Sequence, residues 1–151
     1  MIQGRQCHSA IPFNNKIYVF GGCFQFNRKR QVRECTNQVL EYDLEKQTID
    51  ILKTKGVSIG SRKNHTAVPY KGSMIIYGGQ TENGMVSQDM IVYHMMSQEW
   101  VKLQLKPVTS MPPVIQGGAC AVIPPRNLHA RDTFKTRKVR FFIITNNLII
   151  E

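Results

Sequence analysis

The sequence R-K-N-H-T-A-V-P-Y-K-G-S-M-I-I-Y-G-G, which runs from Arg62 to Gly79, decides the fold. Its first half holds small and apolar residues, and its second half is a β-branched and aromatic run that ends in two glycines. Such runs favour β-strands when turns separate them. The stretch therefore predicts two short strands, His65–Tyr70 and Ser73–Tyr77, and a tight chain exit at Gly78 and Gly79.

The same pattern occurs earlier in the chain, at an offset of 57 residues. R-Q-C-H-S-A-I-P-F begins at Arg5, and K-I-Y-V-F-G-G begins at Lys16. The residues that follow also repeat, at an offset of 51: N-Q-V-L-E-Y-D begins at Asn37 and Q-D-M-I-V-Y-H begins at Gln88. The shorter offset indicates a shorter loop in the second copy. Because self-similarity at a fixed period is typical of repeat architectures, the repeat governs the interpretation.

A third, degraded copy begins near Gln116. Its Ala119–Val122 corresponds to the strand that starts at His65, and its Phe142–Asn147 corresponds to the run that ends in Gly78 and Gly79. Asn146 and Asn147 replace the two glycines, and Asn tolerates a left-handed backbone better than most residues.

Each complete copy predicts four short strands, and no stretch has a sustained helical period. We therefore expect an all-β repeat array. The predicted strands are His8–Phe13, Lys16–Phe20, Val39–Tyr42 and Thr48–Leu52 in the first copy, and His65–Tyr70, Ser73–Tyr77, Met90–Tyr93 and Glu99–Leu103 in the second.

The residues that the copies share resemble the kelch motif, which has an Arg-x-x-His opening, a strand that ends in Gly-Gly, a Tyr in the third strand and a Trp in the fourth. The resemblance covers roughly residues 4–105. It implies a β-propeller whose blades are four-stranded antiparallel sheets, here an incomplete arc of about two and a half blades. The motif residues are Arg5, His8, Gly21, Gly22 and Tyr42 in the first copy, with Ile49 in place of the Trp, and Arg62, His65, Gly78, Gly79, Tyr93 and Trp100 in the second.

The repeats divide the chain into residues 1–57 as kelch repeat 1, 58–106 as kelch repeat 2, and 107–151 as a partial, diverged repeat 3 with a basic insertion near 124–140. Complete propellers use about 4–8 blades, and an open arc leaves strand edges and blade faces unpaired. We therefore expect further blades or other chains to complete the ring. A fragment of a larger propeller is the interpretation that we favour.

The net charge and the length of the apolar runs limit the classes of partner and the cellular location that we expect. The 151 residues carry a net charge of +10, which favours acidic partners. No apolar run approaches the roughly 18 residues of a membrane span, and the first residues lack the apolar core of a signal peptide. We therefore expect a cytoplasmic protein without a membrane partner. Its cysteines, which are Cys7, Cys23, Cys35 and Cys120, should then be reduced thiols.

The connection after the first Gly-Gly, roughly Cys23–Thr36, is longer than its counterpart Gln80–Gln88. In the kelch family this loop projects from a face that often binds partner peptides, so the resemblance implies a partner site here. Aromatic residues together with Arg are common binding hot spots. The alternative is a solvated loop without a function. The candidate partner-binding residues are Phe24, Phe26, Arg28, Lys29, Arg30 and Arg33.

The other conspicuous residues favour structural roles. His8 and His65 recur at one repeat position, so we expect them to be hydrogen-bonded inside each blade rather than to bind metal. We expect Tyr42, Tyr93 and Trp100 to pack between blades. The pattern contains no convergent set of catalytic, cofactor-binding or metal-binding residues.

We therefore expect a non-enzymatic protein–protein interaction module that binds a protein partner, for example an acidic peptide segment. Two alternatives stay open. One is a fragment of a kelch-scaffold enzyme of the oxidase or sugar mutarotase type. The other is a basic nucleic-acid-binding module, which the second basic segment, Arg126–Arg140, supports poorly because it contains one aromatic residue for base stacking.

Overall fold

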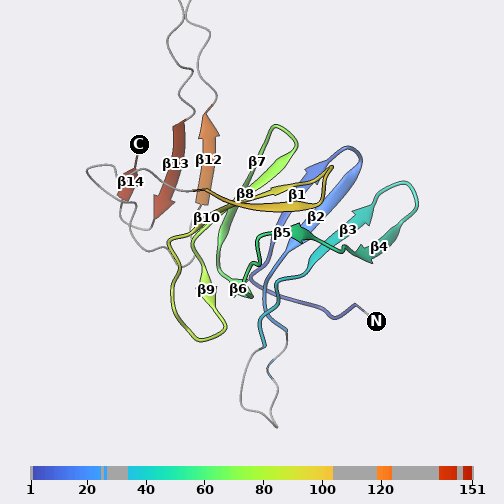
Figure 1. The fold of residues 1–151 in the computed structure, drawn as a ribbon, viewed down its shortest axis with the longest axis horizontal. Coiled ribbons are helices and arrows are strands. Elements are labelled where there is room, and N and C mark those ends of the chain that lie inside the picture. The colour runs from blue at the N-terminus through green and yellow to red at the C-terminus, as the bar shows by residue number, and fades with distance from the viewer. Residues whose placement is uncertain are drawn as a thin grey trace, which may run out of the picture.

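The computed structural model describes residues 2–24, 26, 34–103, 119–123, 140–145 and 148–150, with side-chain surroundings up to residue 103. These residues form strands and turns, with no helix among them. Three main sheets follow one another along the chain, and Figure 1 shows them arranged from right to left in sequence order. The predicted all-β class is confirmed.

The first sheet contains β1 (Ser9–Phe13), β2 (Lys16–Phe20), β3 (Val39–Asp43) and β4 (Thr48–Ile51), in this order and antiparallel throughout. A two-residue turn at Asn14 and Asn15 joins β1 to β2, and both residues have positive φ, of 46° and 58°. Asn tolerates this conformation, which matches the twist of a tight hairpin. The turn before β4 is held by the Asp43 carboxylate, which accepts the Glu45 and Lys46 N–H groups at 3.0 Å each.

The second sheet repeats this arrangement and adds a fifth strand. Its antiparallel strands are β7 (Thr66–Tyr70), β8 (Ser73–Tyr77), β10 (Met90–His94) and β11 (Glu99–Leu103). The short strand β5 (Lys55–Gly56) pairs in parallel with β11 at the outer edge. Gly56 has a φ of 90°, and a side chain there would collide with the Trp100 carbonyl oxygen.

A two-stranded sheet of β6 (Arg62–Lys63) and β9 (Gln80–Thr81) lies beside the second sheet. The third main sheet contains β12 (Ala119–Ile123), β13 (Arg140–Thr145) and β14 (Leu148–Ile150). β7 lies next to both β1 and β12, so the first strands of successive repeats are neighbours. This is the placement that inner strands have in a propeller, and an incomplete arc of kelch-type blades is the observed architecture (Figure 1).

The eight strands predicted for the first two copies are all present, with ends within a residue of those expected. β5, β6 and β9 were not predicted, since two-residue strands leave no pattern in a sequence. The basic insertion predicted near residues 124–140 lies outside the described residues except for Arg140, where β13 begins. The two asparagines at 146 and 147 are also outside them.

The main hydrophobic core lies between the first two sheets. Side chains on one face of the first sheet pack against one face of the second, because alternate residues of a strand point to the same side. A second cluster occupies the opposite face of the second sheet, on the side of the third sheet in Figure 1. The first cluster includes Ile11, Tyr18, Phe20, Val39, Met74, Ile76, Ile91, Tyr93 and Trp100, and the second contains Val68, Ile75, Tyr77, Met90 and Val92.

Candidate partner-binding surface

The arginine that opens each repeat contacts the carbonyl oxygen of the first glycine in the Gly-Gly pair of the same repeat. Arg62 is 3% exposed, and its Nη1 donates to the Gly78 carbonyl oxygen at 3.1 Å. Its Nη2 lies 3.9 Å from the Asp89 carboxylate. Burial lowers the pKa of Arg62, while Asp89 raises it and so favours the charged form. Arg5 repeats the contact, since its Nη1 lies 3.5 Å from the Gly21 carbonyl oxygen.

Close contacts after the ends of β2 and β8 leave no room for a side chain at the second glycine of each pair. Gly22 and Gly79 have φ of 89° and 88°. A Cβ on Gly79 would lie 2.7 Å from the His65 Cβ, and one on Gly22 would lie 3.0 Å from the His8 Cβ. The motif therefore fixes where the chain leaves β2 and β8, and with it the starting point of the loops that follow.

His65 joins one sheet to the next. Its Nε2 and the Ser9 Oγ are 2.8 Å apart, and its ring lies 5.2 Å from the Phe20 ring. Burial, with Arg62 and His8 nearby, lowers the pKa of His65 to about 4, so the ring is neutral at pH 7. The prediction that both repeat histidines are hydrogen-bonded inside their blades is therefore wrong. The partner of His65 lies in the neighbouring sheet, and His8 is exposed.

An aromatic cluster fills the contact between the first two sheets. The Tyr93 ring lies 4.7 Å from the Trp100 ring and 6.5 Å from the Tyr18 ring. The Trp100 ring lies 4.8 Å from the Phe20 ring. Two aromatics of repeat 2 thus pack on two aromatics of repeat 1. The third residue expected between blades, Tyr42, lies half-buried on the opposite side of the first sheet.

That opposite side is an apolar surface, which we call the open face. Each of its residues corresponds by repeat to a position on the second sheet, and at several of these positions the residue of the second sheet is more buried. Ile49 is 41% exposed where Trp100 is 3% exposed, and Tyr42 is half-buried where Tyr93 is fully buried. Within the described residues, the second sheet has a neighbour on this side and the first sheet does not. The open face comprises Ala10, Pro12, Ile17, Val19, Leu40, Tyr42, Ile49 and Ile51.

The connection between β2 and β3 leaves the sheet as a short paired stem. Cys23 pairs with Gln6 on one side and with Cys35 on the other. The Phe24 N–H donates to the Glu34 carbonyl oxygen at 3.0 Å. The stem extends from the end of the blades that faces the bottom of Figure 1, and the shorter β9 hairpin of repeat 2 extends from the same end. We call this end the loop face.

Of the six predicted partner-binding residues, the structure describes the two aromatic ones, Phe24 and Phe26. The Arg5 guanidinium lies 5.5 Å from the centre of the Phe24 ring, so the opening arginine of the motif also orders the stem. Phe26 is 41% exposed. Met85, in the β9 hairpin, is 68% exposed. Sequence reasoning missed Met85, although its place in the corresponding loop of the second copy would have indicated it. Arg28, Lys29, Arg30 and Arg33 lie outside the described residues.

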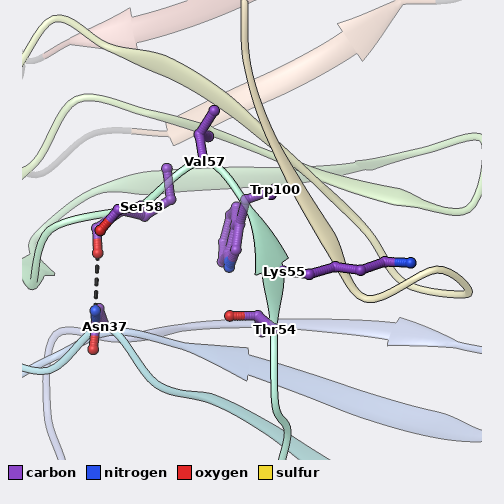
Figure 2. Close-up of a pocket in the computed structure, with 8 residues that line it drawn as sticks. Asn37, Thr54, Lys55, Val57, Ser58 and Trp100 are labelled. Carbon is purple, nitrogen blue, oxygen red and sulfur yellow. Dashed lines mark hydrogen bonds between the residues drawn. The ribbon is translucent and has the colours of Figure 1, made fainter.

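A pocket of about 270 Å³ lies at the outer edge, between the first two sheets. It is lined by Asn37, residues 54–59 and Trp100. The Asn37 Nδ2 donates to the Ile59 carbonyl oxygen at 2.9 Å, and this contact ties β3 to the segment that follows β5. Figure 2 shows Lys55 extending away from Asn37, with Trp100 between Val57 and Thr54. The pocket was not predicted, because it depends on where β5 runs.

The part of the chain that the structure describes contains no group of three or more His, Cys, Asp or Glu side chains that could hold a metal ion. These described residues also contain no helix that could cross a membrane.

Comparisons with known proteins agree with the geometry. A family model described as the KLHDC2/KLHL20/DRC7 Kelch-repeats domain matches residues 2–128. The chain is 25% identical over 75 residues to the Rho GTPase-activating protein gacHH of Dictyostelium discoideum, a match that covers 50% of this chain and 5% of that protein. It is similar to the solved structure of YjhT, with a TM-score of 0.58 and 14% identity over 68% of this chain and 39% of that one. At 14% identity, the similarity to YjhT concerns the fold alone.

Proposed function

The chain belongs to the kelch-repeat family, and we propose that it is a non-enzymatic module that binds another protein at the loop face. The partner contacts the connection between β2 and β3. The cytoplasmic location and the lack of a cofactor stay predictions from the sequence.

The observation that carries the proposal is the presentation of two apolar side chains at one end of the blades. Phe26 and Met85 are 41% and 68% exposed, and they come from corresponding connections of the two repeats. The Arg5 guanidinium contacts the Phe24 ring at the base of the stem. Aromatic and Met side chains are enriched at protein interfaces, so two exposed side chains of these types are suited to bind a partner.

Charge indicates the chemistry of the partner. The net charge of +10 steers acidic molecules towards the chain, and four of its basic residues fall between Phe26 and Glu34 in the sequence. A peptide that alternates acidic and large apolar residues would satisfy both the charge and the exposed side chains. We therefore propose an acidic, apolar-containing segment of another protein as the partner.

The test uses fluorescein-labelled synthetic peptides of Glu and Asp with interspersed Leu and Phe. Binding is followed by fluorescence anisotropy. Phe26→Ala, and separately the reversal of Arg28, Lys29, Arg30 and Arg33 to Glu, should each weaken binding at least about tenfold, or 1.4 kcal/mol. Met96→Ala is the matched control, since Met96 is 77% exposed in the turn at the other end of the second sheet. Equal binding by all variants would refute the site.

We also propose that the open face receives another blade, so that further blades complete the ring. This is supported by the repeat itself: the face of the second sheet that corresponds to the open face is covered by Ile11, Tyr18, Phe20 and Val39 of the first. The blade that covers the open face should present apolar residues at those same repeat positions. Light scattering after size-exclusion chromatography tests whether other copies of this chain supply it. A defined oligomer supports supply by other chains, and a folded monomer at high concentration excludes it.

A further inference from the structure

Two cysteines face each other across the stem of the loop face. Cys23 and Cys35 are direct partners in an antiparallel bridge. The flanking hydrogen bonds run from the Phe24 N–H to the Glu34 carbonyl oxygen and from the Thr36 N–H to the Gly22 carbonyl oxygen, each 3.0 Å long. The two cysteines themselves are therefore a non-hydrogen-bonded pair, the arrangement in which opposite side chains approach most closely.

This pairing satisfies the main geometric requirement of a disulfide. Cα atoms of non-hydrogen-bonded pairs lie about 4.5 Å apart, within the roughly 4.4–6.8 Å that disulfides span. Both residues are free thiols in the structure. Cys23 is buried and Cys35 is half-buried, so Cys35 is the more accessible of the two to an oxidant.

We propose that Cys23 and Cys35 form a reversible disulfide that closes the base of the β2–β3 connection. The oxidant is a low-molecular-weight disulfide such as oxidised glutathione. The Cys35 thiolate attacks one sulfur of the oxidant and displaces one glutathione thiolate. The Cys23 thiolate then attacks the Cys35 sulfur and displaces the second. Two cysteine thiols are thereby oxidised, one disulfide is reduced to two glutathiones, and the two cysteine protons pass to the glutathione thiolates.

Cys7 is the competing thiol, and its position explains why it is not the partner. It follows Gln6, and it is Gln6 that pairs with Cys23 across the other edge of the stem. The N–H and carbonyl groups of Gln6 and Cys23 exchange hydrogen bonds of 2.9 Å each. Cys7 is thus displaced by one residue from the position opposite Cys23, in a bend with a φ of 60°, and the bridges of the stem pair Cys23 with Cys35 and not with Cys7.

Burial also sets how the reaction depends on pH. It raises the pKa of Cys35, and although Lys63 opposes this, the neighbouring Cys23 and Cys7 add to it. The thiolate that starts the exchange is therefore a minor form at neutral pH, and the oxidation should accelerate in mildly alkaline solution.

The test is a peptide map of the wild-type chain, for which the sequence is well suited. Lys16 separates Cys7 from Cys23, the basic cluster from Arg28 to Arg33 separates Cys23 from Cys35, and Lys46 separates Cys35 from Cys120, so trypsin places each cysteine on its own peptide. The chain is incubated with oxidised glutathione, its free thiols are alkylated in acid, and it is digested without reduction. We expect the Cys23 and Cys35 peptides to be joined, to lose alkylation together, and to separate after dithiothreitol.

Controls decide between this pair and its competitors. Cys7→Ser and Cys120→Ser should leave the joined peptides unchanged, and Cys35→Ser should abolish them. The same oxidation in urea should lose the preference for one pair, because the stem is then unfolded. Full alkylation of Cys23 and Cys35 after oxidation, or peptides joined through Cys7, would overturn the proposal. The map reads the bond directly, so its outcome is independent of whether the loop face binds a partner.

Discussion

Ser9 and His65, 56 residues apart in the sequence, are joined by a hydrogen bond of 2.8 Å between the Ser9 Oγ and the His65 Nε2. The bond links the first strand of one repeat to the entry of the next. His8 holds the same repeat position as His65, yet it is exposed. The motif histidine of the second repeat is thus buried against the preceding blade, whereas that of the first repeat has no preceding blade among the described residues.

The His65 contact predicts a pH-dependent stability. The pKa of His65 in the folded chain, about 4, lies below the ordinary histidine value of 6.5, so between these pH values the unfolded chain binds a proton that the folded chain does not. This contribution to stability is complete above about pH 6.5 and is lost as the pH falls towards 4, with a total of about 3 kcal/mol. Urea unfolding across this range measures it. His65→Gln should flatten the dependence, whereas His8→Gln should preserve it, and an unchanged slope in His65→Gln would contradict the assignment.

Trp100 and Ile49 occupy one repeat position, and we expect them to differ in energetic importance. Trp100→Ala should destabilise the chain by about 3–5 kcal/mol, because it empties the centre of the contact between sheets. Ile49→Ala should cost about 0.5 kcal/mol or less in the monomer, since the side chain is 41% exposed. The free energies of unfolding of the two variants check this. Similar losses would mean that the open face is already covered.

The second glycine of the motif should resist substitution. Gly79→Ala places a Cβ 2.7 Å from the His65 Cβ at a φ of 88°. We expect the free energy of unfolding to fall by about 1–3 kcal/mol or more from the backbone strain alone. Gly60→Ala is the control, because a Cβ there meets nothing within 4 Å. Thermal unfolding followed by circular dichroism distinguishes the two variants, and equal midpoints would show that the exit can relax.

If other copies of the chain cover the open face, a charge there should disrupt their association. Ile51→Asp should weaken self-association by at least about tenfold, which corresponds to 1.4 kcal/mol. Leu44→Asp changes a residue of similar exposure, 44% against 49%, outside the open face and should have no effect. Light scattering over a concentration series provides the measurement. If both variants associate like the wild type, the open face is not where copies meet.

The strands of the first two repeats could be predicted because their pattern is local. β-branched and aromatic residues at a constant offset specify both the strands and the order in which they pair, and β2 and β8 were placed correctly on that basis. The destination of a side chain is not local. His65 bonds to Ser9 across two sheets, and nothing near either residue in the sequence indicates this contact.

The candidate site was predictable in part for the same reason. Phe24 and Phe26 were identified from the length and composition of their loop, but the contact between Arg5 and Phe24 depends on the pairing of Gln6 with Cys23, which the sequence does not indicate. Met85 was missed because its loop is short, and only the correspondence of this loop to the β2–β3 connection indicates the residue. The facing of Cys23 and Cys35 follows from the pairing register of the stem, which sequence spacing does not determine.

The strand β5 has a consequence for how such a chain can grow. Lys55 and Gly56 fall within the first repeat of the sequence, but they hydrogen-bond to β11 of the second sheet. A gene duplication that copies the first repeat therefore also copies an edge strand for whatever repeat comes next. The second unit thus receives its outer edge strand from the first, so a tandem copy of the first repeat would bring the edge strand for its successor, whereas an unrelated domain inserted before the second repeat would leave β11 without this partner.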